Sequence, residues 1–248
     1  MSPWLSFYRS TIGKKVIAAL TGLLMMGFLV VHMAGNFKVF LPDPEPGVAD
    51  IDVYARFLRS MGEPLLPHES ALWIARLVLL AALLLHVTCV SQLALRNRRA
   101  RPASYARHRL AVATPAARWM LVSGGLLLIF VVVHLLHFTT GSLDPQHFQP
   151  GAVYANLHAA FSHWGFAAFY AAAMVVLGLH LYHGGWSLFQ TLGIDNPDRN
   201  AFLRTTAAAL ALAVALGFAA IPISIALGIL PEPRTTTPAE LPGAPQGR

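Results

Sequence analysis

Five long apolar stretches limit what this chain of 248 residues can fold into. They lie at about 16–41, 71–95, 119–139, 164–190 and 205–230. Each can cross a bilayer core, which needs about 20 helical residues. Only 12% of the residues are charged, whereas soluble domains carry about 25%. The sequence predicts an all-α membrane protein with five transmembrane helices in one domain, residues 1–230. The Pro-rich tail, 231–248, is expected to be disordered.

Basic residues gather in alternate connections between the stretches. The second connection carries seven arginines between positions 96 and 118, whereas the third, around 142–163, has no Lys or Arg. Cytoplasmic loops are enriched in Lys and Arg. With the N-terminus inside, twelve of the 18 basic residues lie on the inner side and nine of the 11 acidic residues outside. This placement predicts a topology with the N-terminus inside and the C-terminus outside. It also predicts that the partner of this basic chain is the lipid bilayer and not nucleic acid.

Four histidines stand at a similar depth in the first four stretches: His32, His86, His134 and His180. Successive helices run in opposite directions, so the first and third lie roughly 24 Å from the inner face and the other two lie near it, at 1.5 Å per residue. The two layers are roughly 15 Å apart in a core about 30 Å thick. Two imidazoles fill both axial positions of a low-spin haem iron. We therefore expect the first four helices to bundle around two stacked haems, ligated by an outer pair, His32–His134, and an inner pair, His86–His180.

Two further histidines leave this assignment open on the residues alone. His137 and His183 follow two of the candidate ligands by three residues, on nearly the same helix face. Each lies closer to the membrane surface, so we favour roles near the anionic haem propionates. Other propionate candidates, on the inner side, are Lys14, Lys15, Arg118, Ser187 and Gln190. For any single histidine, a local polar contact inside the membrane is the alternative.

Four motifs surround these histidines: "TGLLMMGFLVVHMAGNFKVF", "LLLHVTCVSQLALRNRRARPASYA", "FVVVHLLHF" and "HLYHGGWSLFQTLGI". Together they resemble the cytochrome b membrane subunit of succinate dehydrogenases and fumarate reductases, in its single-subunit, five-helix, two-haem form. The resemblance runs from about Ser6 to Leu230. It implies two haem b groups ligated by His32, His86, His134 and His180, in preference to His137 and His183.

The resemblance also implies partners and a reaction. A flavoprotein with FAD and an iron–sulfur subunit would dock on the cytoplasmic face of a bacterial cytoplasmic membrane, and the whole complex could form a higher oligomer. Electrons from succinate would pass through the inner and then the outer haem to a quinone, usually menaquinone. This chain would be the quinone-reactive, electron-transfer subunit of the enzyme. Residues that could exchange quinone protons at the outer end are Glu63, His68 and Glu69.

One position departs from the family pattern. Some two-haem fumarate reductases carry a buried carboxylate two residues before the fourth-helix ligand, where this chain has Gly178, and no Asp or Glu occurs in any predicted span. A proton route through such an acid is therefore not expected.

Other readings stay open. The haem subunit of a nitrate reductase or hydrogenase, or an ascorbate-linked cytochrome b carrier, is the nearest alternative, although several of these use a ligand on the last helix and the fifth stretch here has no histidine. A transporter or assembly factor without haem is an alternative of a different class. The sequence leaves open whether the complex oxidises succinate or reduces fumarate.

Overall fold

A computed structural model describes residues 2–100, 115–194, 196 and 198–233, without the side chains of 115–118. The described chain is helical and contains no strand. Its elements are α1 (Pro3–Arg9), α2 (Thr11–Asn36), the 3-10 helix η1 (Phe37–Phe40), α3 (Asp50–Ser60), α4 (Ser70–Arg99), α5 (Pro115–Phe138), α6 (Val153–Phe161), α7 (Trp164–Thr191) and α8 (Asn200–Ala226). The expected tail, 231–248, lies outside the described residues from position 234 onward.

Five helices, α2, α4, α5, α7 and α8, are long and apolar enough to cross a membrane. The predicted five-span, all-α fold is confirmed. The first spanning helix, α2, starts at Thr11, earlier than the hydropathy indicates, because the Ser10 hydroxyl accepts a 2.8 Å hydrogen bond from the Gly13 amide. Such a bond satisfies one of the free amides at a helix start and extends the helix beyond its apolar core. The fifth helix likewise begins before its predicted boundary, at Asn200.

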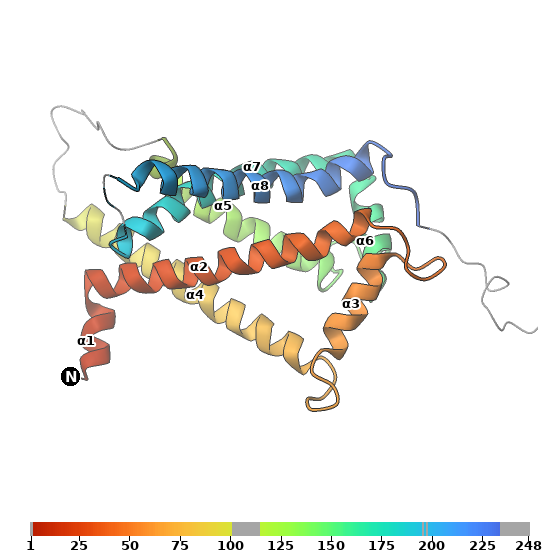
Figure 1. Ribbon diagram of the computed structural model, residues 1–248, viewed down its shortest axis with the longest axis horizontal. Coiled ribbons are helices and arrows are strands. Elements are labelled where there is room, and N and C mark those ends of the chain that lie inside the picture. The colour runs from red at the N-terminus through yellow and green to blue at the C-terminus, as the bar shows by residue number, and fades with distance from the viewer. Residues whose placement is uncertain (1, 101–114, 195, 197, 234–248) are drawn as a thin grey trace, which may run out of the picture.

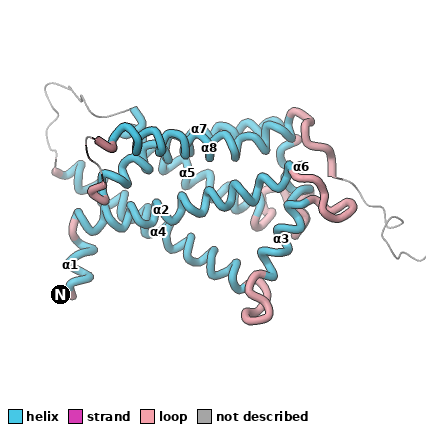
Figure 2. Tube along the Cα trace, in the orientation of Figure 1, coloured by secondary structure: helices cyan, strands magenta, loops and turns pink. Residues whose placement is uncertain are grey.

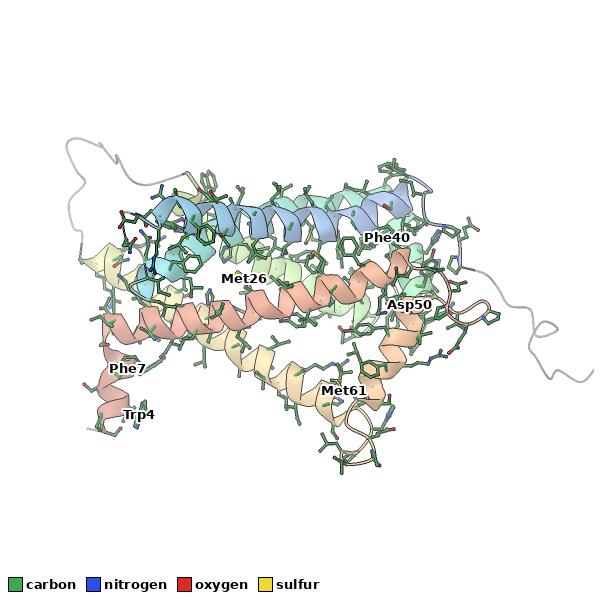
Figure 3. The ribbon with its side chains drawn as sticks, in the orientation of Figure 1. Trp4, Phe7, Met26, Phe40, Asp50 and Met61 are labelled. Carbon is green, nitrogen blue, oxygen red and sulfur yellow. The ribbon has the colours of Figure 1, made fainter. Side chains whose placement is uncertain are left out.

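Two short helices, α3 and α6, lie where the hydropathy indicates only connections. They cover one end of the molecule together with η1, which lies at the end of the first predicted span, and we call this the capped end. Asp52 joins them, because its Oδ1 accepts a 3.0 Å hydrogen bond from the Tyr154 amide. The salt bridge between Lys38 and Asp50, at 2.8 Å, ties η1 to α3. Figure 3 labels Phe40, at the end of η1, and Asp50, at the start of α3, in this region.

The opposite end holds α1 and the basic residues of α2 and α4, and we call it the basic end. Figure 1 shows α1 at this end, far from α3 and α6. Arg96 of α4 donates to the Arg9 carbonyl at 3.0 Å and to the Thr11 hydroxyl at 3.4 Å. These bonds fasten the junction between α1 and α2 to α4. Helix α1 leaves Trp4 82% exposed, as expected for an aromatic side chain at a membrane interface.

The long helices pack unevenly. Helices α7 and α8 have the most extensive contact, α2 packs against α4, and α5 packs against α7. Figure 2 shows loops at the two ends and at the corner between α3 and α4, with α4 diverging from α2 towards that corner. Buried apolar side chains form one cluster at the capped end, around Phe161 and Tyr170, and a small one midway along α7 and α8, around Val214. No comparable cluster forms at the basic end of the described bundle.

The histidine-bearing helices are the least buried. In the most apolar 18 residues of each spanning helix, the fraction of residues that are buried is 0% in α2, 11% in α4, 6% in α5 and 22% in α7. It is 33% in α8, which has no histidine. Side chains of this chain therefore leave much of the surface of α2, α4 and α5 uncovered. Lipid, or a large apolar group held between the helices, must cover it.

Candidate functional site

The two histidines nearer the capped end face each other across the bundle. The rings of His32 (α2) and His134 (α5) have centroids 6.1 Å apart and planes at 80°. Two imidazoles that bind one metal ion at about 2.0 Å have centroids about 6 Å apart. The spacing of this outer pair therefore suits a shared metal. No ring contact joins His137 to His32 in the described part of the chain.

Aromatic rings surround this outer pair. Phe28 and Phe218 lie 5.3 and 5.5 Å from His32, measured between ring centroids. Phe130 and Phe138 lie 5.9 and 5.6 Å from His134. The Nδ1 atom of His134 is buried and has no hydrogen-bond partner among the described residues. Packing, not hydrogen bonding, thus positions the outer rings.

The two histidines nearer the basic end are held by hydrogen bonds to neighbouring helices. His86 (α4) has its Nδ1 2.9 Å from the Ala18 carbonyl oxygen of α2. A carbonyl only accepts, so Nδ1 carries the proton and donates it, and Nε2 keeps its lone pair. This is the tautomer in which Nε2 can bind a metal.

His180 (α7) reaches the same tautomer through a side chain. Its Nδ1 lies 3.0 Å from the Ser123 hydroxyl oxygen of α5, and that hydroxyl donates its own proton to the Met120 carbonyl at 3.0 Å. The hydroxyl therefore accepts from the ring, and Nε2 is again free. His86 and His180 thus each offer a free Nε2, one from α4 and one from α7. Within the described residues no ring contact joins these two histidines, unlike the outer pair.

A buried cation, Lys14, lies one helical turn before Ala18, whose carbonyl accepts the hydrogen bond from His86. Lys14 is 2% exposed, and its Nζ lies 4.0 Å from the centroid of the Tyr8 ring. No carboxylate of the described residues lies within salt-bridge distance of it. Lysine is almost never fully buried without an anionic partner. Lys14 thus fits an anionic group of a bound molecule at the basic end.

These features together test the fit of a haem. In the described ranges, His, Cys, Asp and Glu side chains form no group of three or more able to hold a metal ion. A haem iron needs only two protein ligands, and the chain has four histidines at two depths. The spacing of His32 and His134, the free Nε2 atoms of His86 and His180 and the buried Lys14 all suit an anionic macrocycle with axial imidazoles. The residues fit the group.

The remaining propionate candidates have varied surroundings. His137 is buried, and its Nδ1 lies 3.2 Å from the Tyr170 hydroxyl. His183 and Ser187 are partly buried on α7, whereas Lys15 and Gln190 are exposed. The side chain of Arg118 lies outside the described residues. The roles of all these residues stay predictions.

The three quinone candidates lie together at the corner between α3 and α4. His68 Nδ1 is 2.8 Å from Glu63 Oε1, and Glu69 Oε1 is 3.4 Å from Arg59 Nε. An open hollow of about 580 Å³ beside them is lined by Glu45, Val53, Arg56, Phe57, Arg59, Ser60 and His68. Figure 3 labels Met61 at this corner, well away from α7 and α8. Among the described residues, no hydrogen bond, ion pair or ring contact links the three candidates to the outer histidine pair.

Sequence reasoning missed the residues that hold the inner histidines. Thr21–Gly22 precedes His32 in α2 with the same spacing as Ser123–Gly124 precedes His134 in α5, and both steps are 102 residues apart. This repeat of a hydroxyl residue, a glycine and a histidine was a signal available in the sequence. The spacing of 102 residues between its two copies is longer than the 20 to 50 residues of ordinary tandem repeats.

Comparisons with protein-family models, curated proteins and solved structures found no match for this chain.

Proposed function

We propose that this chain is the di-haem cytochrome b subunit that anchors a succinate:quinone oxidoreductase in a bacterial cytoplasmic membrane. The observation that carries the proposal is the presence of two histidine pairs at two depths of one helical bundle. Each pair comes from two different helices, α2 and α5 for the outer one and α4 and α7 for the inner one.

The four histidines would hold the two haems as axial ligands, with His32 and His134 on the outer one and His86 and His180 on the inner one. Bis-imidazole haem b supplies one-electron transfer without binding oxygen. The chain's own part is to orient the rings and exclude water. Lys14 would offset propionate charge near the inner pair, because its ammonium is buried and has no carboxylate partner within the described chain.

The basic end would face the cytoplasm and bind the flavoprotein and iron–sulfur subunits. Exposed Arg98, Arg99 and Lys15 lie there, and Arg96 ties α1 to α4 so that these cations form one surface. Cytoplasmic enrichment of basic residues supports this orientation. Electrostatic complementarity between such a surface and an acidic partner speeds docking and sets its register.

The corner between α3 and α4 would serve the quinone at the outer side. The hydrogen-bonded pair of His68 and Glu63 can take up or release protons, and the neighbouring hollow opens beside it. The quinone head group would exchange protons with this pair as it is reduced or oxidised. Menaquinone is the quinone that the family resemblance favours.

Haem counting on the purified complex tests the proposal. We expect two haems b per chain and a reduced α-band with two redox transitions. Each of the variants His32→Ala, His86→Ala, His134→Ala and His180→Ala should lose at least one haem. His163→Ala, at an exposed site before α7, is the matched control and should keep both. A wild-type chain without haem, or four variants that all keep two, would refute the proposal.

Co-purification separates the proposed complex from other haem carriers. Gentle solubilisation should bring down a flavoprotein with covalent or bound FAD and an iron–sulfur protein, together with succinate–quinone activity. Two haems without these partners would favour a haem subunit of another respiratory complex. Comparison of succinate oxidation with fumarate reduction in the same preparation gives the working direction.

A further inference from the structure

Two hydroxyl–glycine steps, Thr21–Gly22 and Ser123–Gly124, occupy equivalent places beside the inner histidines. We propose that they are positioning residues that orient His86 and His180 towards the inner haem iron. Of the two hydroxyls, only that of Ser123 determines the hydrogen bond of its histidine, His180, and through it the electron affinity of the inner haem. The inference rests on the proposed function, since it concerns ligands of that haem.

Ser123 is the hydrogen-bond partner of His180 Nδ1. The Ser123 hydroxyl accepts from the ring at 3.0 Å and donates to the Met120 carbonyl at 3.0 Å. Ser123 is 9% exposed, so water has little access to replace the bond. Removal of this hydroxyl therefore leaves the His180 ring without its acceptor in a buried site.

Thr21 holds His86 less exclusively. Its hydroxyl lies 3.3 Å from His86 Nδ1, but the same nitrogen donates to the Ala18 carbonyl at the shorter distance of 2.9 Å. The Thr21 hydroxyl itself donates to the Ile17 carbonyl at 2.7 Å. A backbone carbonyl cannot be removed by a side-chain substitution, so the His86 ring keeps its acceptor when the Thr21 hydroxyl is lost.

The two glycines bring the rings close to the neighbouring backbone. A Cβ at Gly22 would lie 3.3 Å from His86 Cε1, and a Cβ at Gly124 would lie 3.5 Å from His180 Cε1. Each ring thus packs onto a helix face without a side chain. Hydrogen bond and contact together restrict ring rotation, which keeps Nε2 directed into the bundle.

The consequence is an asymmetry within one ligand pair. A hydrogen bond from Nδ1 makes an imidazole a better donor to its metal and stabilises the oxidised form. Loss of that bond shifts the haem towards its reduced form. The shift should follow substitution of Ser123 and not of Thr21, although the two residues are equivalent in sequence.

The experiment compares Ser123→Ala with Thr21→Val in the purified complex, by redox titration and by low-temperature electron paramagnetic resonance of the low-spin ferric signals. The inner transition is first assigned as the one that His180→Ala removes. At a fixed potential, Ser123→Ala should raise the reduced-to-oxidised ratio of the inner haem about fivefold, the worth of one net hydrogen bond. Its ferric signal should move, and the outer haem should not change. Thr21→Val should change the inner ratio less than about twofold.

Equal shifts in the two variants, or no shift in Ser123→Ala with both haems bound, would overturn the inference while leaving the proposed function intact. A wild-type chain that binds no haem would instead defeat the proposed function itself. Ser123→Ala that loses only the inner haem supports the inference. If Ser123→Ala fails to fold, Ser123→Thr decides: this variant keeps the hydroxyl and should retain the wild-type ratio, and an altered ratio would overturn the inference.

Discussion

The inner and outer histidine pairs are held in place by different forces. Each inner ring donates from Nδ1 to a neighbouring helix, to the Ala18 carbonyl or to the Ser123 hydroxyl. The outer rings instead lie among phenylalanines, and His134 Nδ1 is buried without a partner. Hydrogen bonds fix both the tautomer and the rotation of a ring, whereas packing fixes only its position.

This difference gives the two sites different energetic requirements. An unsatisfied buried polar group costs about 1–3 kcal/mol, and the outer pair carries such a group. The inner pair is already oriented by its own helices, but it lies at the end of the bundle that lacks an apolar core cluster within the described residues. The outer site therefore depends on packing, and the inner site on hydrogen bonds and charge.

The largest effect is expected from Phe130→Ala. Phe130 stacks on His134 at 5.9 Å and meets the Tyr170 ring at 5.2 Å. Truncation should lower the free energy of unfolding by about 3 kcal/mol, because it leaves a cavity beside the outer pair. When the purified complex is heated and haem absorbance is monitored, the outer haem should be released at a lower temperature than in the wild type. The inner haem should be retained. Phe202→Ala, at a site 71% exposed, is the control and should change neither. Earlier loss of the inner transition would contradict the contrast between the pairs.

A smaller effect is expected from neutralising Lys14. Its side chain is buried, and the residue lies one helical turn before Ala18, whose carbonyl accepts from His86. Removal of a positive charge near a haem stabilises its oxidised form by about 1–2 kcal/mol at an effective dielectric constant near 20. Lys14→Gln should therefore lower the midpoint potential of the inner haem, where about 59 mV corresponds to a tenfold change. The adjacent Lys15 is exposed, so Lys15→Gln is a matched control. Equal shifts from the two variants would show that the burial of Lys14 has no bearing on the inner site.

The fold was largely predictable from hydropathy, because a bilayer imposes its thickness on each helix. All five spans were found this way. The errors lie at helix ends and in connections. The Ser10 cap starts α2 early, and α3 forms in an acidic, Pro-containing connection because Asp50 and Asp52 lie at its positive, N-terminal end. Hydropathy does not register either effect.

The depth of each histidine along its helix predicted part of the site. It placed His32 opposite His134, as the structure has them. It could not show that the Ala18 carbonyl serves His86, because backbone groups carry no sequence signature. Ser123 was detectable in principle from its 102-residue correspondence with Thr21. That correspondence becomes meaningful only when both residues are seen beside a histidine from another helix.

The smallest expected effect tests whether the two glycines are equally close to their rings. Gly22→Ala places a Cβ 3.3 Å from His86 Cε1, which requires the ring to move by a few tenths of an ångström. Gly124→Ala places one 3.5 Å from His180 Cε1, an ordinary contact. Alanine also gains about 1 kcal/mol of helix propensity over glycine in either position. We therefore expect Gly124→Ala to be neutral or stabilising, and Gly22→Ala to change the inner ferric resonance signal without haem loss. Both variants retain the hydrogen bonds of the inner pair, so a change confined to Gly22→Ala would arise from ring displacement alone. A larger change in Gly124→Ala would show that the ring of His180, and not that of His86, is the more tightly confined.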